Sequence, residues 1–397
     1  MVKNRARGYI VQMPPLLRVV HRAVARALVL LALGAAAPGP VAAEELTAEG
    51  IVVDLPSGFV PAEGDRTTRF SYLSPDGQIQ FDILLREPGE FPSVEGLAAA
   101  MLAKLGSQAP SANFAYEGRQ AVIAELSFTM NGSPRNGYAL FLTAALGSGY
   151  ALLAHSPASR FDSAADFIMS CLDAFSIDRA ARRSPGPVSQ FLLPWPAPRP
   201  ERKTVDLPGG RSELPWSPEE AEQELYTVQR EYRILQTYLA NPTLWRDAWA
   251  RFYRMVYRES AGRLDAITEA FALPAADPTE SARRVLAWVQ DFLYERDPSG
   301  LDFVPPLAAA FGRRGDCDSR ALVMAAILEA AGLDCVLMLS REYSHSMLAV
   351  DVPGGGQRFP FKGKEYLVAE TTAKVGLGMI DSSQTDLSKW LGVELGD

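Results

Sequence analysis

Segment 312–331 constrains the fold more than any other part of the chain. Residues 312–319 read GRRGDCDS, and residues 321–331 are almost wholly apolar until Gly332. An apolar stretch of this length predicts a helix that is buried on all sides and ends at the glycine. Cys317 then lies in the first turn, where free backbone N–H groups and the helix dipole favour an anion. We expect this position to lower the pKa of the thiol and to favour a thiolate at neutral pH.

The residues that follow predict three strands with polar side chains at their ends. Residues 335–339, 346–352 and 366–369 are apolar or β-branched runs. Successive strands joined by short turns are usually antiparallel neighbours. His345 begins the second strand and Glu370 follows the third. A helix-start cysteine, a histidine on the sheet and a carboxylate one strand further supply a nucleophile, its base and the group that orients the base.

The sequences GDCDS, SHSMLAV and YLVAETT at these positions resemble the transglutaminase-like superfamily, over roughly residues 278–379. The resemblance implies a papain-like core in which Cys317 is the nucleophile, His345 the general base and acid, and Glu370 the orienting carboxylate. The family usually has Asp at this last position. Glu is one methylene longer and can still accept a hydrogen bond from an imidazole. We therefore expect a transglutaminase-like domain over residues 278–397.

Each of these residues also has a purely structural interpretation. Cys317 can be an inert buried thiol, His345 a strand histidine and Glu370 a solvated strand end. Outside residues 1–43 the chain has one other histidine, His155, which follows a strand and has no obvious companion in the sequence. His345 is therefore the expected base.

Two acids and an arginine surround the cysteine in the sequence. We expect Asp316 and Asp318 to cap the helix and to oppose a thiolate, and Arg320, one turn into the helix, to offset them. The chain has no Cys-x-x-Cys, no pair of histidines at ligand spacing and no phosphate-binding loop. The sequence therefore predicts no metal and no cofactor.

Residues 1–43 predict a secretory signal peptide. Six basic residues without an acid precede the apolar stretch 27–37, and a Pro-Gly-Pro-Val-Ala-Ala segment ends at Ala43. This order of a basic region, a short apolar region and small residues predicts export with cleavage after Ala43, while a start at Met13 would shorten the basic region. The apolar stretch is too short to span a membrane. We expect an exported protein, periplasmic or secreted.

The net charge limits the classes of binding partner, and the cysteine count limits the possible disulfides. The chain has 39 basic and 47 acidic residues, and loss of residues 1–43 leaves 33 basic ones, so the mature chain carries about 14 net negative charges. Nucleic acid and anionic lipid are therefore excluded as expected partners. The cysteines are Cys171, Cys317 and Cys335. The predicted helix separates Cys317 from Cys335. A Cys171–Cys335 bridge is then the only pairing compatible with catalysis by Cys317, and the other alternative is no bridge.

Residues 44–178 predict an α+β domain with an antiparallel sheet. Turn residues at 74–77, 131–132 and 147–149 separate alternating runs and predict three hairpins. Helices are expected at 94–105 and 163–175. This order, from the opening IVVDLPSGF to the closing helix and short strand, resembles the PsbP/Mog1-like group of domains.

Residues 179–216 contain eight prolines and predict an extended linker. Its apolar run 191–195 either docks on a neighbouring domain or covers a groove as a plug. Residues 217–277 predict a helical segment that begins with a Ser-Pro-Glu-Glu cap and carries an aromatic stripe from Trp245 to Val256. We expect that stripe to form core or interface.

Two functions are compatible with these features. The first is an exported cysteine enzyme that transfers the acyl group of a peptide or amide to water, as a peptidase or amidase, or to an amine, as a transglutaminase. The second is a non-catalytic envelope module that binds its partner with a transglutaminase-like fold. Peptide or protein is the expected ligand in both, and the sequence leaves the substrate and the oligomeric state open.

Overall fold

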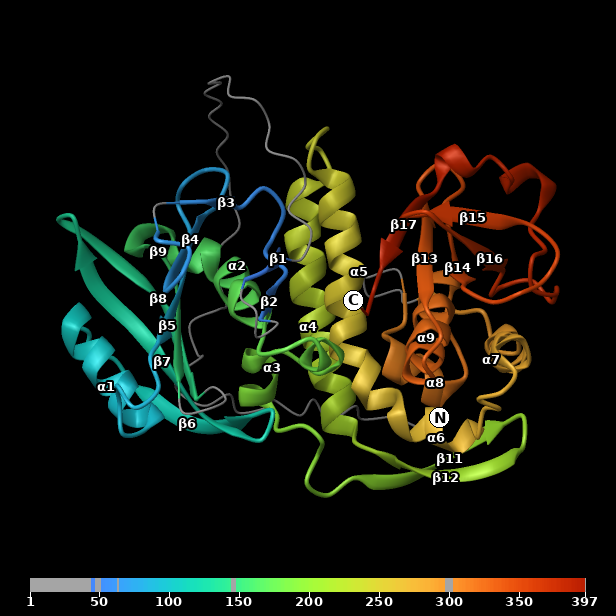
Figure 1. Ribbon diagram of the computed structural model, residues 1–397, viewed down its shortest axis with the longest axis horizontal. Helices are drawn as coiled ribbons and strands as arrows, with labels where there is room; N and C mark the ends of the chain where they lie inside the picture. Colours follow the sequence, from blue (N-terminus) through green and yellow to red (C-terminus); the bar gives the residue numbers. More distant parts are fainter. Residues whose placement is uncertain (1–43, 47–50, 63, 144–147, 297–302, 397) are drawn as a thin grey trace, which may run out of the picture. The chain divides into compact units, whose positions relative to one another are not determined.

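The computed structural model describes residues 44–46, 51–62, 64–143, 148–296 and 303–396 (Figure 1). The predicted signal peptide lies outside these residues. The chain divides into two compact units, and each is treated separately. The first unit comprises residues 60–114 and 119–168, and the second comprises residues 40–59, 115–118 and 169–397. The boundary therefore falls within the predicted domain 44–178.

A seven-stranded sheet forms the first unit, with the strand order β3-β4-β5-β9-β8-β7-β6. Its strands are β3 (Val60–Pro61), β4 (Arg69–Leu73), β5 (Gln80–Arg86), β6 (Ser111–Tyr116), β7 (Arg119–Met130), β8 (Ser133–Thr143) and β9 (Gly149–Pro157). The β4–β5, β7–β8 and β8–β9 pairs are antiparallel, as the predicted hairpins require. Asn131 and Gly132 both adopt positive φ in the β7–β8 turn, which is the geometry that Asn-Gly favours. Residues 144–147 lie outside the described residues.

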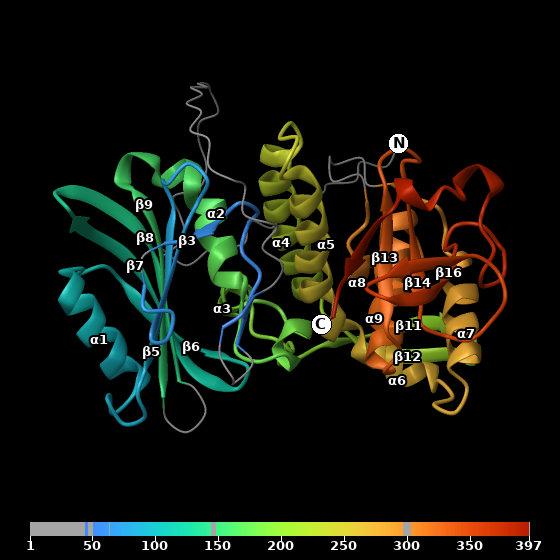
Figure 2. The same cartoon turned by 45° about the horizontal axis from the view of Figure 1, so that its top comes forward.

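Helix α1 (Val94–Leu105) has the bounds that the sequence predicts. The Ser93 hydroxyl caps its N-terminus, and Gly106 ends it in the left-handed conformation. Its buried side chains, Leu97 and Met101 among them, pack on β7, β8 and β9 and form the core of this unit. Figure 2 shows α1 along one face of the sheet.

His155 on β9 has neighbours that the sequence did not reveal. Arg135 donates a hydrogen bond from Nε to His155 Nδ1 at 3.1 Å, and Asp82 Oδ2 lies 3.9 Å from Nε2. Burial and the charge of Arg135 lower the pKa of His155 to about 4. The expectation that this histidine has no companion was wrong, and the residue is a neutral part of the core.

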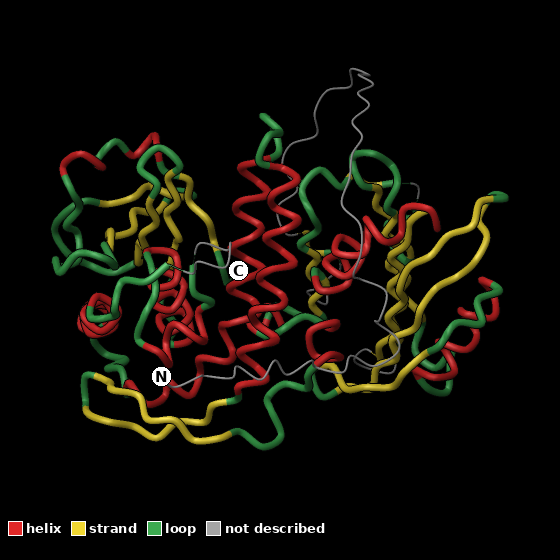
Figure 3. The backbone as a smooth tube through the Cα atoms, turned by 180° about the vertical axis from the view of Figure 1, so that it is seen from behind, coloured by secondary structure: helices red, strands yellow, loops and turns green. Residues whose placement is uncertain are grey.

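Two long helices run side by side in the second unit, α4 (Pro218–Tyr238) and α5 (Trp245–Ala261) (Figure 3). Ser217 caps α4 by accepting a hydrogen bond from the Glu220 N–H at 3.0 Å, as the Ser-Pro-Glu-Glu sequence predicts. The pair carries buried charges on its inner face. Arg230 contacts Asp173 at 2.7 Å and Glu231 at 2.8 Å. Such charges are tolerated in a core only when they are paired.

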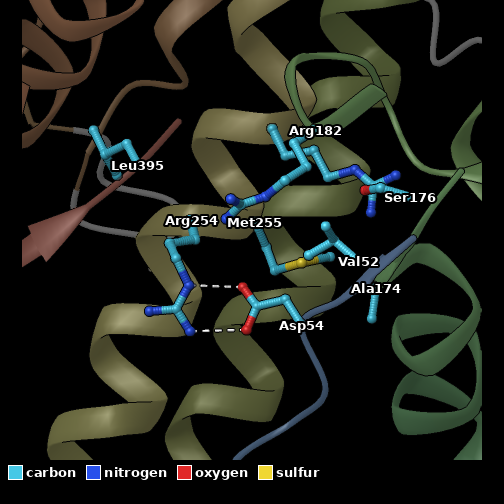
Figure 4. A pocket seen from close by; sticks show the side chains of 9 residues that line it. Val52, Asp54, Ala174, Ser176, Arg182, Arg254, Met255 and Leu395 are labelled. Atoms are coloured by element: carbon cyan, nitrogen blue, oxygen red, sulfur yellow. Dashed lines mark hydrogen bonds and ion pairs between the residues drawn. The ribbon is translucent and has the colours of Figure 1, made fainter. Parts of the chain in front are cut away.

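The start of the described chain also belongs to this second unit. Strands β1 (Glu44–Glu45) and β10 (Phe175–Ser176) flank β2 (Val52–Val53) in a three-stranded sheet. Asp54 then forms a two-pronged ion pair with Arg254 on α5, at 2.7 and 2.8 Å (Figure 4). Arg251 donates to the Asp54 carbonyl at 2.7 Å. These contacts fasten the segment after β2 to α5.

Residues 179–216 do not form the extended linker that their prolines predict. They form a short helix, α3 (Pro187–Leu192), and a hairpin of β11 (Glu201–Leu207) and β12 (Gly210–Trp216). Proline is favoured at the first position of a helix, and Gly210 adopts positive φ in the hairpin turn. Trp195 packs so closely on Gly262 that an added Cβ would lie 2.7 Å from the indole. This contact supports docking of the apolar run.

The C-terminal part of the second unit surrounds a central buried helix, α9 (Cys317–Ala330). The helix packs on a sheet of order β15-β16-β14-β13-β17 and contacts α5, α7 (Pro278–Gln290) and α8 (Pro306–Gly312). The strands are β13 (Cys335–Ser340), β14 (His345–Val350), β15 (Arg358–Phe361), β16 (Lys364–Ala369) and β17 (Leu391–Glu394). The three predicted strands are adjacent and antiparallel, and the outer strands β15 and β17 were not predicted. No helix in the described residues is both long and apolar enough to cross a membrane.

Candidate active site

Cys317 is the first residue of α9, as the sequence predicts. Asp316 caps the helix, because its carboxylate accepts the Ser319 N–H at 3.1 Å. Gly315 has φ of +155°, and an added Cβ there would lie 2.5 Å from the Ser319 Cβ. Only glycine allows the chain to enter the helix in this way. The entry leaves Cys317 nearly buried, with 6% of its surface exposed.

His345 and Glu370 lie within hydrogen-bond distance of each other. The His345 Nε2 is 2.7 Å from Glu370 Oε2. Glu370 Oε1 accepts hydrogen bonds from the Thr372 N–H at 2.7 Å and from its hydroxyl at 2.6 Å. The Gln290 amide donates to the Glu370 carbonyl at 2.8 Å and so holds the chain after β16. The longer side chain of Glu, compared with Asp, therefore reaches the imidazole.

His345 interacts with Cys317 as well as with Glu370, and His345 and Cys317 line the same pocket. Glu370 lies at Nε2, which leaves Nδ1 available to the thiol. Burial alone would lower the pKa of His345, but the hydrogen bonds to Cys317 and Glu370 outweigh it and raise this pKa to about 10. Burial opposes the charge on Glu370 as well, yet the hydrogen bond and charge of His345 hold the pKa of Glu370 below its ordinary value. His345 and Glu370 therefore form an ion pair at neutral pH.

The acids beside Cys317 have different partners. Asp316 is buried and accepts from Ser319, and burial together with the charge of Asp318 raises the pKa of Asp316 to about 7. Asp318 does not act as a simple cap, because it accepts a hydrogen bond from the Tyr253 hydroxyl on α5. Burial and this bond raise the pKa of Tyr253 well above its ordinary value. The capping prediction is confirmed for Asp316 only.

The charge of Arg320 interacts with that of Asp316, in line with the expected offset, but its hydrogen bonds go elsewhere. Its guanidinium is buried and donates to three backbone carbonyls, those of Gly315 at 3.0 Å, Phe292 at 2.7 Å and Thr371 at 3.4 Å. These bonds tie the start of α9 to the chain after β16. Arg320 thereby fixes the distance between the helix that bears Cys317 and the segment that bears Glu370.

A pocket of about 370 Å³ opens beside Cys317 and His345. Trp249, Phe252 and Tyr253 of α5 line one wall, and Arg341, which follows β13, lines another. The Arg341 guanidinium also lies 5.3 Å from the ring centre of Trp245. The sequence predicted a core or interface role for this aromatic stripe and gave no signal that it reaches the site. The wall depends on tertiary packing of α5 against α9.

One group of side chains near the pocket has the spacing of a metal site. The donor atoms of Asp316, Cys317 and Asp318 all lie within 4.8 Å of one another. The carboxylate of Asp316 is already bonded to Ser319, and that of Asp318 to Tyr253. A cluster of acids alone does not establish a metal site, so we assign no metal to these three residues.

The other two cysteines are buried free thiols. Cys171 and Cys335 form no disulfide, so of the two alternatives left by the sequence the structure has no bridge. Burial raises the pKa of Cys171 to about 12 and that of Cys335 well above its ordinary value. Neither thiol is ionised at neutral pH.

Comparisons with known proteins give weak structural likenesses. No family model matches the chain, and no curated protein matches it. A cyanobacterial PsbP from Synechocystis is 11% identical with a TM-score of 0.28, and the match covers 36% of this chain and 98% of that one.

Two further solved structures are similar at the same low level. A protein from Bacteroides thetaiotaomicron is 10% identical, with a TM-score of 0.23 over 54% of this chain and 76% of that one. A Pseudomonas aeruginosa protein of unknown function, described as a putative regulator, is 12% identical, with a TM-score of 0.21 over 39% of this chain and 87% of that one.

Proposed function

We propose that the chain is a cysteine-dependent acyl-transfer enzyme acting on peptide or amide bonds. One observation carries the proposal: His345 lies 2.7 Å from the Glu370 carboxylate and interacts with Cys317, with which it lines a pocket of about 370 Å³. A nucleophile, a base and an orienting acid in this order constitute a catalytic triad. The transglutaminase-like resemblance of residues 278–379 supports the same assignment and a papain-like core.

The proposed reaction begins with the Cys317 thiolate beside the His345 imidazolium. The sulfur attacks the carbonyl carbon, and the carbonyl electron pair moves to oxygen. The backbone N–H of Cys317, in the first turn of α9, donates to this oxyanion. The oxyanion then collapses, the C–N bond breaks, and His345 gives its proton to the leaving amine. The product is a thioester on Cys317 with a neutral His345.

The acyl group leaves Cys317 in a second step, in which His345 accepts a proton instead of donating one. Neutral His345 takes a proton from water, the hydroxide attacks the thioester carbon, and the C–S bond breaks to restore the thiolate and the imidazolium. Glu370 stays ionised and holds the imidazole in place throughout. We propose water as the acceptor, which makes the enzyme a peptidase or amidase. An amine in the same position would make it a transglutaminase.

Acylation by p-nitrophenyl acetate tests the proposal without knowledge of the natural substrate. The wild-type chain should release a burst of p-nitrophenolate equal to the enzyme concentration, and mass spectrometry should find the acetyl group on Cys317. Cys317→Ala should abolish the burst and His345→Ala should slow it at least a hundred-fold. Cys171→Ala and Cys335→Ala are matched controls that should keep it.

The same assay separates the alternatives. Faster turnover on addition of glycine methyl ester, with formation of the acetylated amine, would favour a transglutaminase over a hydrolase. No acetyl-Cys317 in the wild-type chain would contradict catalysis and favour the non-catalytic binding module. The acids beside Cys317 are the feature that supports that second function, because they oppose a thiolate. Export also stays a proposal, tested by the N-terminal sequence of the mature protein, which we expect to start at Glu44.

A further inference from the structure

Arg86 in the first unit has a buried polar atom without a partner. Its Nε is buried and makes no hydrogen bond, and its Nη2 donates only a weak bond to the Met101 sulfur at 3.6 Å. Among the residues that the structure describes, no carboxylate pairs with this guanidinium. Arg86 as a whole is partly exposed, but a buried N–H group without a partner is unfavourable and requires an explanation.

The position of Arg86 in the fold makes its unpartnered nitrogen more unusual. Leu84, two residues earlier on β5, packs against the core under α1. Side chains two residues apart share a face of a strand, so Arg86 extends from the face that α1 covers. It is the last residue of β5, next to Gly149 at the start of β9. The buried Nε of Arg86 therefore lies at the end of the core, on the face that α1 covers.

A pocket of about 380 Å³ opens at this place, where β5 and β8 end and β9 and α1 begin. Arg86 lines it together with the apolar side chains of Phe91, Leu97 and Leu142. The volume is in the range of small-ligand sites. At about 30 Å³ for each non-hydrogen atom, it holds roughly ten to twelve atoms.

The charges around the pocket favour a single negative group. The free N–H groups at the start of α1, a helix of twelve residues, add to the positive potential of Arg86. Glu87 also borders the pocket, but it is exposed and forms no ion pair with Arg86 among the described residues. One fixed cation and an apolar wall match a monoanion with an apolar body.

We propose that this pocket binds a small amphipathic carboxylic acid of about ten to twelve non-hydrogen atoms, with its carboxylate on Arg86 and its apolar body against Phe91, Leu97 and Leu142. A guanidinium group donates two parallel hydrogen bonds to a carboxylate. The ligand would satisfy the buried nitrogen and fill the apolar space in one step. The site is independent of Cys317.

Calorimetric titration of the full chain with octanoate tests the proposal, with octanamide as the uncharged analogue. Wild type should bind octanoate at least ten-fold more tightly than octanamide. Arg86→Met should weaken octanoate at least ten-fold and leave octanamide within two-fold, whereas Arg86→Lys should lose less. Lys104→Met, at an exposed position on α1, is the matched control and should bind as wild type does.

A second variant tests the pocket independently of whether Arg86→Met folds. Thr143→Glu places an anion at the pocket and should also weaken octanoate at least ten-fold, whereas Thr129→Glu, exposed elsewhere on the sheet, should not. N-acetyl-leucine and its amide distinguish a peptide carboxyl terminus from a fatty acid as the source of the carboxylate. No octanoate binding by wild type, or equal binding by wild type, Arg86→Met and Thr143→Glu, would overturn the proposal.

Discussion

The charge on His345 depends on Glu370, and Glu370→Gln tests this directly. The pKa of His345 lies near 10 because Cys317 and Glu370 stabilise the imidazolium more than burial opposes it. Gln keeps a hydrogen-bonding group at the 2.7 Å contact but removes the negative charge. Two unit charges about 4 Å apart at an effective dielectric constant of 20 interact by about 4 kcal/mol, equivalent to about 3 pKa units. The pKa of His345 should therefore fall to about 7 in the variant.

Proton and carbon NMR of the imidazole groups measures this pKa. His155 and His345 are the histidines beyond residue 43, and the pKa of His155 lies near 4. In the wild-type mature chain neither resonance should titrate between about pH 5.5 and 8.5, where an ordinary histidine does. Glu370→Gln should introduce one titration near 7, absent from the Glu370→Gln, His345→Gln double variant. Glu365→Gln, an exposed glutamate on β16, should behave as wild type.

The same pair predicts a pH window for stability. Because the pKa of His345 is raised, its contribution is complete below about 6.5 and is lost as the pH rises through about 10. Because the pKa of Glu370 is lowered, its contribution is complete above about 4.5 and is lost at lower pH. Wild type should exceed Glu370→Gln in unfolding free energy most between about pH 4.5 and 6.5. A wild-type resonance that titrates near 6.5, or no change in the variant, would refute the reasoning.

Three further predictions concern stability, measured by urea unfolding. Asp54→Asn leaves Arg254 without its ion-pair partner and should destabilise the second unit by about 3 kcal/mol. Burial raises the pKa of Glu224 to about 7, although hydrogen bonds from Ser260 and Leu307 oppose the shift. An acid with a raised pKa in the folded state lowers the free energy of unfolding as the pH rises from about 4.5 to 7. Glu224→Gln should therefore gain about 3 kcal/mol in this free energy relative to wild type between pH 5 and 8. Gly137→Ala places a Cβ 2.1 Å from a backbone oxygen of β9 and should destabilise the first unit by about 3 kcal/mol or more.

Each of these variants has a matched control at an exposed position. Asp206→Asn breaks an exposed ion pair and should change stability by less than about 0.5 kcal/mol. Glu222→Gln, also on α4, should leave the pH dependence unchanged. Gly209→Ala adds a Cβ that meets no atom within 4 Å. Equal effects in a variant and its control would contradict the assigned contact.

Local signals in the sequence predicted most of the elements. Caps and turn residues gave α1 its bounds at Val94 and Leu105 and placed the Asn131–Gly132 hairpin, because these features depend on neighbouring residues. The all-apolar run gave α9, with Cys317 at its start. The order of strands β13, β14 and β16 then brought His345 and Glu370 together, as predicted from short connections.

The remaining features depend on contacts between distant residues. The proline count of residues 179–216 predicted a linker, but the alternation in β11 and β12 forms a hairpin there. Arg320 was expected to offset the charge of the acids beside it, but the sequence did not indicate that its guanidinium donates to three backbone carbonyls. The α5 wall of the pocket, with Tyr253 on Asp318, had no signal at all in residue spacing.

The pH dependence of Cys317 alkylation by iodoacetamide tests the central claim, a thiolate held by His345, most directly. The proposed thiolate–imidazolium pair predicts a wild-type rate at pH 6 within about three-fold of the rate at pH 8, because His345 stays charged across this range. In His345→Ala the rate at pH 6 should fall at least ten-fold below that at pH 8, as for an ordinary thiol with a pKa near 8.5. A wild-type profile that rises with pH as steeply as that of His345→Ala would contradict the account.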